Sequence, residues 1–277
     1  MIITVVGLGV IGGSYVQALK GLGYEVYGVD CNEDTLKKAK DDGCIIEGYT
    51  DGHEIIAKSD LTMICLYPSL VLDFIASHSF KKGSIVSDVV GIKSYFLQKA
   101  LKIIPSDVEY VSGHPMAGRE KKGYDYASKE VFKNANYIVI EHPQNQKQAI
   151  DFMCQFVSQL GFKSVKIMSP YAHDEIISFT SQLPHSLAVA LINSDNQKYN
   201  TGKYIGDSFR DLTRIANINA QLWCELFLNN KDYLLASMER FEEQFDQIKQ
   251  AIMNDDEETL KKMFKESTYR RENLEKS

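Results

Sequence analysis

A short apolar run at residues 2–6 is followed at once by three glycines in the spacing GxGxxG, and a helical pattern begins within the motif. Gly7, Gly9 and Gly12 each have a reason to be glycine: a tight turn, close approach of the backbone to a pyrophosphate, and close packing of helix on strand. The start of the helix also presents backbone N–H groups to anionic oxygens. The feature predicts a dinucleotide site, with a glycine turn that binds no ligand as the alternative. The residues expected at this site are Gly7, Leu8, Gly9, Val10, Ile11 and Gly12.

The first 168 residues alternate between strand-like and helical patterns. Helical stretches at 12–22, 33–42 and 94–102 separate several of the strand-like runs, many of which are almost continuously apolar. Such runs are typical of parallel strands that are covered on both faces. The alternation predicts an α/β fold with a Rossmann-type, doubly wound sheet. The expected strands are 2–6, 25–30, 61–67, 84–89, 109–113, 137–141 and 164–168.

After residue 168 the pattern becomes helical throughout, and we find no convincing strand in it. A chain of 277 residues is long enough for two domains. We therefore expect a dinucleotide-binding domain over 1–168 and an all-α substrate and dimerisation domain over 169–277. The helices are rich enough in leucine and aromatic residues to bury a partner surface, so a homodimer through them is expected. The acidic run at 255–258 is typical of the start of a helix.

Asp30 ends the second strand-like run, 21 residues after Gly9. A carboxylate at this place accepts hydrogen bonds from a ribose 2′-hydroxyl and repels a 2′-phosphate. Cys31 and Asn32 follow, with no arginine to accommodate the phosphate. The pattern therefore predicts NAD rather than NADP as the cofactor, with an ordinary turn acid as the alternative.

Composition argues against several other classes of protein. The five cysteines form no CxxC pair and the six histidines show no ligand spacing, so no metal is assigned. The net charge of −6 does not suggest a nucleic-acid-binding surface. No apolar run approaches the roughly 20 residues of a membrane span. The first residues lack the basic segment and cleavage site of a signal peptide, so we expect a cytoplasmic protein.

His114 follows a short apolar run and stands between Gly113 and Pro115. Proline restricts the residue before it to extended geometry. We therefore expect this histidine to be held where a strand runs out into a loop. A histidine that only anchors the loop is the alternative to a functional one.

Four segments in this order are specific: "GLGVIGGS" at the glycine turn, "GHPMAG" around His114, "SQLPH" at 181–185, and the long segment 206–231 that contains "TRIA". Together they resemble the prephenate dehydrogenase/arogenate dehydrogenase family of tyrosine biosynthesis. The resemblance implies NAD-dependent oxidative decarboxylation of a small cyclohexadiene acid. Prephenate would give 4-hydroxyphenylpyruvate, and arogenate would give tyrosine directly.

The resemblance also implies residue roles. His114 would accept the proton of the substrate hydroxyl, and Arg214 would bind a substrate carboxylate. His185 would contact the substrate, with a core histidine as the alternative. Gln182 stands where the family has another histidine and is expected at the substrate too. The implied catalytic residues are His114, His185 and Arg214, and an ionic network around Arg214 would include Glu120, Asp174 and Asp211.

Two positions depart from the family pattern. Gly91 replaces a serine of some relatives that contacts the substrate or the histidine, while Lys93 is retained near it, either as a structural residue or near the cofactor. Together with Gln182, this leaves the choice between prephenate and arogenate open. We expect no regulatory domain after the helices, so that any inhibition by tyrosine would act at the active site or the dimer interface. The remaining alternatives are a β-hydroxyacid dehydrogenase with a catalytic lysine, and a non-catalytic NAD sensor.

Overall fold

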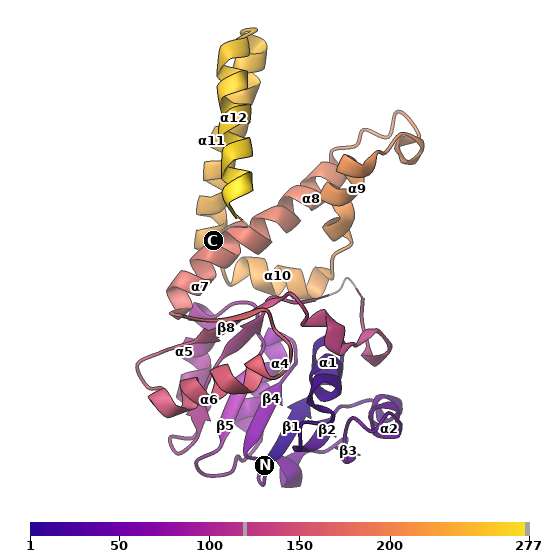
Figure 1. Ribbon diagram of the computed structural model, residues 1–277, viewed down its shortest axis with the longest axis vertical. Coiled ribbons are helices and arrows are strands. Elements are labelled where there is room, and N and C mark those ends of the chain that lie inside the picture. Colours follow the sequence, from indigo (N-terminus) through magenta and orange to yellow (C-terminus); the bar gives the residue numbers. More distant parts are fainter. Residues whose placement is uncertain (119–120, 275–277) are drawn as a thin grey trace. The chain divides into compact units, whose positions relative to one another are not determined.

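The computed structural model describes residues 1–118 and 121–274, and Figure 1 shows the arrangement of the elements. Six strands form a parallel sheet in the order β3-β2-β1-β4-β5-β6. This order is that of the Rossmann fold, which confirms the predicted fold class. The strands are β1 (Ile2–Val6), β2 (Glu25–Val29), β3 (Glu47–Tyr49), β4 (Leu61–Ile64), β5 (Ile85–Asp88) and β6 (Glu109–Tyr110).

Helices cover both faces of this sheet because its strands carry apolar side chains on both sides. In β4, Leu61 and Met63 pack into the core under α1, α2 and α6, whereas Ile64 packs on the opposite face under α4 and α5. This alternation is the period of two of a strand. The helices before residue 168 are α1 (Val10–Leu19), α2 (Glu33–Asp41), α3 (His53–Ile56), α4 (Pro68–Ser77), α5 (Ser94–Ile103) and α6 (Lys147–Ser158).

A second sheet of three strands continues the α/β part. It contains β7 (Gly113–Pro115), β8 (Asn136–Ile140) and β9 (Ser164–Met168), with β8 antiparallel to β7 and parallel to β9. The strand predicted at 109–113 is therefore divided: its first residues form β6 in the large sheet, and Gly113 begins β7 in the small one. The short polar strand β3 and the helices α3, α4 and α6 were not among the predicted elements. Short 3₁₀ turns lie at Tyr124–Tyr126 and Lys129–Val131.

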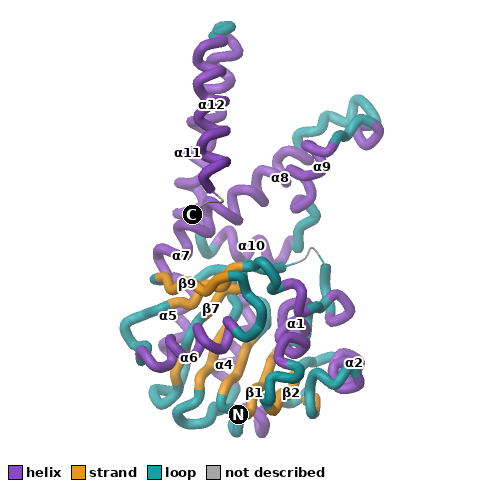
Figure 2. The backbone as a smooth tube through the Cα atoms, viewed as in Figure 1, coloured by secondary structure: helices purple, strands orange, loops and turns teal. Residues whose placement is uncertain are grey.

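Among the described residues after 168 the chain is helical, and Figure 2 shows the strands confined to the part before it. Helix α7 (Pro170–Ile177) continues through a π-helical turn (Ser178–Gln182) into α8 (Leu183–Asn193). A 3₁₀ turn at Thr201–Lys203, α9 (Asp207–Thr213), a 3₁₀ turn at Arg214–Ala216 and α10 (Ala220–Leu228) follow. No helix among the described residues is long and apolar enough to cross a membrane.

The chain divides into two compact units, residues 1–230 and 231–277. In the second unit, α11 (Lys231–Met253) and α12 (Glu257–Leu274) pack together as a helical hairpin. Asp256 caps α12 by accepting hydrogen bonds from the backbone N–H and the hydroxyl of Thr259, at 3.0 and 2.7 Å. The division at residue 168 stays a prediction.

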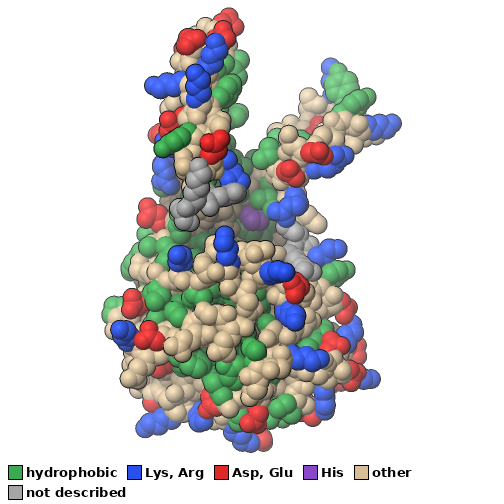
Figure 3. Space-filling model, viewed as in Figure 1, with side chains coloured by type: hydrophobic (Ala, Val, Ile, Leu, Met, Phe, Trp, Pro, Cys, Tyr) green, Lys and Arg blue, Asp and Glu red, His purple; other side chains and the backbone are tan. Residues whose placement is uncertain are grey.

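In the view of Figure 3, acidic and basic side chains lie interspersed over the surface.

Candidate active site

The turn between β1 and α1 requires two of its glycines. Gly7 has φ +81°, and a Cβ on it would lie 2.7 Å from the carbonyl oxygen of Cys65, which follows β4. A Cβ on Gly12 would lie 1.9 Å from the carbonyl oxygen of Gly7. A Cβ on Gly9, in contrast, would meet no atom within 4 Å, so the space beside this residue is open. The turn lies between the carboxyl ends of β1 and β4, where strand order reverses and Rossmann folds bind ligands.

Asp30 lies directly after β2 and is tied to the glycine turn. Its Oδ2 accepts a hydrogen bond from the backbone N–H of Leu8 at 2.7 Å, and its Oδ1 accepts one from Asn32 N–H at 2.9 Å. A carboxylate oxygen has lone pairs for more than one donor. An open glycine turn, a helix N-terminus and an anchored carboxylate together fit a dinucleotide with an unmodified ribose.

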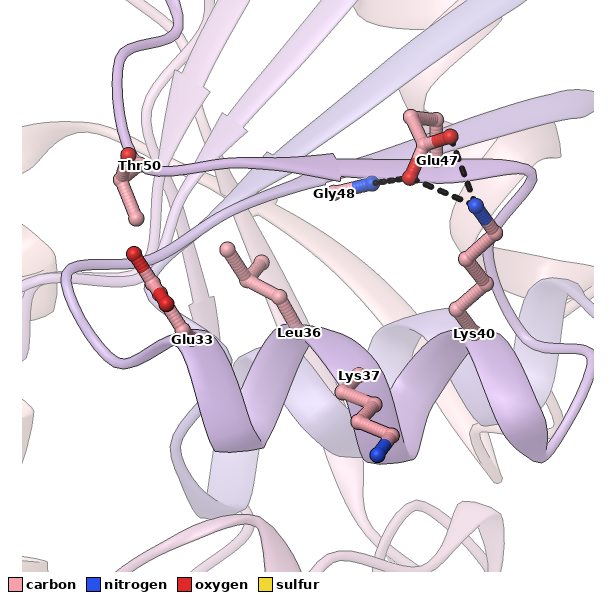
Figure 4. Close-up of a pocket in the computed structure, with 7 residues that line it drawn as sticks. All are labelled: Glu33, Leu36, Lys37, Lys40, Glu47, Gly48 and Thr50. Carbon is pink, nitrogen blue, oxygen red and sulfur yellow. Dashed lines mark hydrogen bonds and ion pairs between the residues drawn. The ribbon is translucent and has the colours of Figure 1, made fainter.

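A hollow between α2 and β3 does not belong to this arrangement. Figure 4 shows Lys40 of α2 reaching across it to Glu47 of β3, with an N–O distance of 2.7 Å. None of the predicted site residues lines this hollow. It is therefore not the candidate active site.

The backbone at His114 is held by tight packing of β7 on β8. A Cβ on Gly113 would lie only 2.1 Å from the hydroxyl oxygen of Tyr137, so that only glycine fits this position. The histidine itself is partly exposed. A Cβ on Gly91, which follows β5, would lie 3.6 Å from His114 Nε2. His114 thus stands near the carboxyl end of β5, at the same edge of the parallel sheet as the glycine turn.

Lys93 lies beneath His114 and is fully buried. Its ammonium group donates to Asp88 Oδ1 at 2.9 Å, to Ser112 Oγ at 2.8 Å and to the carbonyl oxygen of Gly113 at 2.6 Å. All three of its donors therefore have acceptors. Burial lowers the pKa of Lys93, and the negative charge and hydrogen bond of Asp88 offset only part of that lowering. The lysine holds the backbone that carries His114, which favours the structural one of its two predicted roles.

The ring of His114 contacts a second histidine. Its Nδ1 lies 2.8 Å from Nε2 of His173 in α7, and Nδ1 of His173 lies 2.8 Å from Oδ1 of Asp174. Burial, the neighbouring His173 and Lys93 hold the pKa of His114 well below 6.5. The ring is therefore neutral at neutral pH, the state that a general base requires.

The other predicted substrate residues lie on the helices that follow. His185 in α8 donates from Nδ1 to the carbonyl oxygen of Ser181 at 2.8 Å, and its ring lies against Trp223 of α10, 3.7 Å between centroids. One turn further along α10, Leu226 lies beside Gly91 and so beside His114. Arg214 is exposed, in a 3₁₀ turn that packs on α8. Helix α10 thus lies beside the surroundings of both His114 and His185, and α8 carries His185 and contacts the turn that holds Arg214.

Gln182 is placed differently from the expectation of a substrate contact. Its side chain is buried, donates to the carbonyl oxygen of Leu226 at 3.0 Å, and accepts from Asn230 Nδ2 at 2.8 Å. Both ends of its amide therefore have protein partners, and they connect the π-helical turn to the end of α10.

The acids implied around Arg214 lie in different surroundings. Asp174 is buried, and it accepts hydrogen bonds from His173 and from the backbone N–H groups at the start of α5. Asp211 lies exposed in α9, three residues before Arg214, and Glu120 lies outside the described residues. The carboxylate of Asp174 thus accepts hydrogen bonds from His173 and from the start of α5.

The sequence did not predict a role for His173 or an ion-pair partner for Lys93. His173 stands in "YAHDE", where an adjacent histidine and acid form no recognisable motif. Asp88, the partner of Lys93, lies within the predicted strand 84–89, and a strand pattern by itself does not indicate an ion pair. Within the described ranges, 1–118 and 121–274, no group of three or more His, Cys, Asp or Glu could hold a metal ion.

Comparison with known proteins gives the family of the chain. A family model described as the nucleotide-binding domain of prephenate dehydrogenase matches residues 16–166, and one described as its dimerization domain matches residues 169–266. The prephenate dehydrogenase of Bacillus subtilis (strain 168) is 29% identical over 282 residues, which cover 98% of this chain and 76% of that protein. The cyclohexadienyl dehydrogenase of Zymomonas mobilis is 27% identical over 275 residues, covering 96% and 93%.

A solved structure gives the same result. The crystal structure of prephenate dehydrogenase from A. aeolicus, in complex with hydroxyphenyl propionate and NAD⁺, is similar with a TM-score of 0.89 at 28% sequence identity. The similarity covers 99% of this chain and 98% of that one. The motifs, the fold and these matches agree over nearly the whole length, and the chain therefore belongs to the prephenate dehydrogenase family.

Proposed function

We propose that this chain catalyses the NAD-dependent oxidative decarboxylation of prephenate to 4-hydroxyphenylpyruvate, with His114 as the base. The observation that carries the proposal is the position of a neutral, partly exposed imidazole at the edge of the sheet that also holds the glycine turn. A base and a dinucleotide that meet at one edge suit removal of a proton and a hydride from the same carbinol.

NAD⁺ would supply the hydride acceptor. The open space at Gly9 and the first turn of α1 would hold its pyrophosphate, and Asp30 would accept hydrogen bonds from the adenosine ribose. The carboxylate of Asp30 disfavours a 2′-phosphate, because two anionic groups would be brought together. The preference for NAD over NADP follows from this residue.

His114 takes the proton of the substrate's C4 hydroxyl in this proposal. Loss of that proton and of the C4 hydride prepares the ring for loss of CO₂, which makes it aromatic. Arg214 would bind a substrate carboxylate, because a guanidinium suits a two-point contact with it. His185 would contact the substrate from α8, where Trp223 holds the ring in place. We assign Gln182 to the packing of these helices.

The same proposal includes the organisation of the protein. We propose a dinucleotide-binding domain over 1–168, a helical domain over 169–277, and a homodimer through the latter. The second unit supports the dimer with large apolar side chains that are exposed in the chain alone, among them Phe245, Ile252 and Phe264. The five free cysteines suit a reducing compartment such as the cytoplasm.

The test is NADH formation, followed by absorbance, with prephenate and arogenate side by side and with NAD⁺ and NADP⁺. We expect turnover with prephenate and NAD⁺. Turnover with arogenate alone would replace the substrate but keep the reaction. NAD⁺ binding without turnover of either acid would refute the proposal in favour of a sensor or another dehydrogenase.

A further inference from the structure

The carboxylate of Asp174 is the end of a buried hydrogen-bonded chain. It accepts from the backbone N–H groups of Lys93 and Ser94, at 2.8 and 2.7 Å, and from His173 Nδ1 at 2.8 Å. The two backbone donors stand at the start of α5, where the helix dipole favours a negative charge. Burial raises the pKa of Asp174, but the hydrogen bonds from His173 and Ser94 outweigh it and lower the pKa overall. Asp174 is thus an ionised group that can only accept hydrogen bonds.

An ionised Asp174 decides which nitrogen of His173 carries the proton. Because the carboxylate accepts, Nδ1 of His173 must be the donor. The ring of His173 is fully buried, and burial lowers its pKa, so it is neutral. A neutral imidazole with a proton on Nδ1 has its lone pair on Nε2.

That lone pair then decides the state of His114. Nε2 of His173 lies 2.8 Å from Nδ1 of His114, and the two rings are inclined at 59°. His114 Nδ1 must therefore be the donor, and in the neutral ring the lone pair is on Nε2. This nitrogen lies on the Gly91 side, where a Cβ would be 3.6 Å away, and not on the His173 side.

We propose that His173 and Asp174 are positioning residues that fix His114 in the tautomer with Nε2 as the proton acceptor. The inference rests on the proposed function for the identity of the reaction. In that reaction the hydroxyl proton passes to Nε2, and the electrons of the O–H bond stay on the substrate oxygen. The positive charge that develops on His114 then faces a chain of acceptors that ends in a carboxylate, which stabilises it.

The tautomers can be read directly from the ¹⁵N resonances of the imidazole rings in protein labelled with ¹⁵N-histidine, without any substrate. His114 is assigned from the resonances that disappear in a His114→Asn variant. We expect a protonated Nδ1 and an unprotonated Nε2 for His114. His142 serves as an internal reference with the opposite state, because its Nε2 donates to the carbonyl oxygen of Tyr110 at 3.0 Å.

Two substitutions separate positioning from packing. His173→Gln keeps an amide oxygen that can accept the His114 Nδ1–H, whereas His173→Met fills a similar volume without a comparable acceptor. We expect His173→Met to give a protonated Nε2 on part of the His114 population and to lower kcat at least about tenfold. The KM for prephenate should change by less than about threefold, and His173→Gln should recover most of the loss.

A matched control is His142→Met, which removes a buried imidazole that lies outside this chain of hydrogen bonds and should leave kcat unchanged. Thermal unfolding of each variant checks that it is folded. A wild-type His114 protonated on Nε2, or a His173→Met variant with unaltered tautomer and kcat, would overturn the inference. Because the ¹⁵N measurement needs no turnover, a protein with the expected tautomer but no activity on prephenate would instead refute the proposed function.

Discussion

The buried contact between Lys93 and Asp88 offers a quantitative test of how the base is held. Both side chains are completely buried, and the lysine donates hydrogen bonds of 2.9, 2.8 and 2.6 Å to Asp88, Ser112 and Gly113. The change Lys93→Met keeps much of the side-chain volume and removes the charge and all three donors. It leaves the carboxylate of Asp88 buried without its cation.

Removing one partner of a buried ion pair costs about 3–5 kcal/mol of unfolding free energy. Asp88 keeps two other donors, the Tyr110 hydroxyl and the Val90 backbone N–H, both at 2.8 Å. We therefore expect the lower end, about 3 kcal/mol. At roughly 2–4 °C per kcal/mol for a protein of this size, the midpoint of thermal unfolding should fall by about 6–12 °C.

The matched control is the double change Lys93→Met/Asp88→Asn, measured with both single variants by urea and thermal unfolding. An asparagine can still accept from Val90 N–H, and its amide can donate to the oxygen of Tyr110. Without a buried charge, the double variant should be more stable than Lys93→Met alone, by at least about 1 kcal/mol. A loss below about 1 kcal/mol in Lys93→Met, or a double variant whose loss equals the sum of the single losses, would refute the reasoning.

Three further predictions concern the reaction. His114→Asn should lower kcat by about 10²–10⁴-fold with NAD⁺ affinity nearly intact, and a kcat close to wild type would remove His114 from the mechanism. Arg214→Gln should mainly raise KM, by an amount equivalent to about 1.5–3 kcal/mol for a lost charged hydrogen bond; an unchanged KM would make the arginine structural. Because burial, His173 and Lys93 hold the pKa of His114 well below 6.5, the base is lost only as pH falls through that low value. The acid limb of kcat/KM should therefore lie below pH 6.5, and a limb centred above it would contradict this assignment.

The sequence predicted correctly those structural features that depend on a few adjacent residues. The glycine turn, the acid at the end of β2 and the histidine before a proline each combine a motif with its own structural context, and the structure places them at one edge of the sheet. The period of the apolar residues likewise predicted most strands and the change to helices. Strand β3 was missed because three residues, Glu47–Tyr49, are too short to show a period. The split of the predicted strand 109–113 follows from pairing of Gly113 with β8, which lies more than 20 residues further along the chain.

The contacts that the sequence could not show are those between residues distant in the chain. Gln182 was expected at a substrate because of its position in a motif, yet the nearest acceptor for its amide is a backbone carbonyl in α10. Asp174 was expected beside an arginine, yet the packing of α7 on α5 brings it to the start of that helix. The residues that flank Gln182 and Asp174 in the sequence do not predict these contacts, because the contacts form only when α5, α7 and α10 pack together.

The two buried contacts of the His114 region constrain different parts of the same residue. Lys93 binds the carbonyl oxygen just before His114 and so fixes the course of the backbone, whereas His173 binds the ring and so fixes its rotation and its proton. A general base must have both its position and its free nitrogen defined before the substrate arrives, since a misplaced or wrongly protonated ring cannot accept the proton. Two glycines leave space around His114. The absence of a side chain at Gly113 makes room for the hydroxyl of Tyr137, and its absence at Gly91 leaves space beside Nε2 of His114. Burying charged groups costs free energy of folding. The need to fix the position and the protonated nitrogen of His114 thus explains why Lys93, Asp88 and Asp174 are buried close to it.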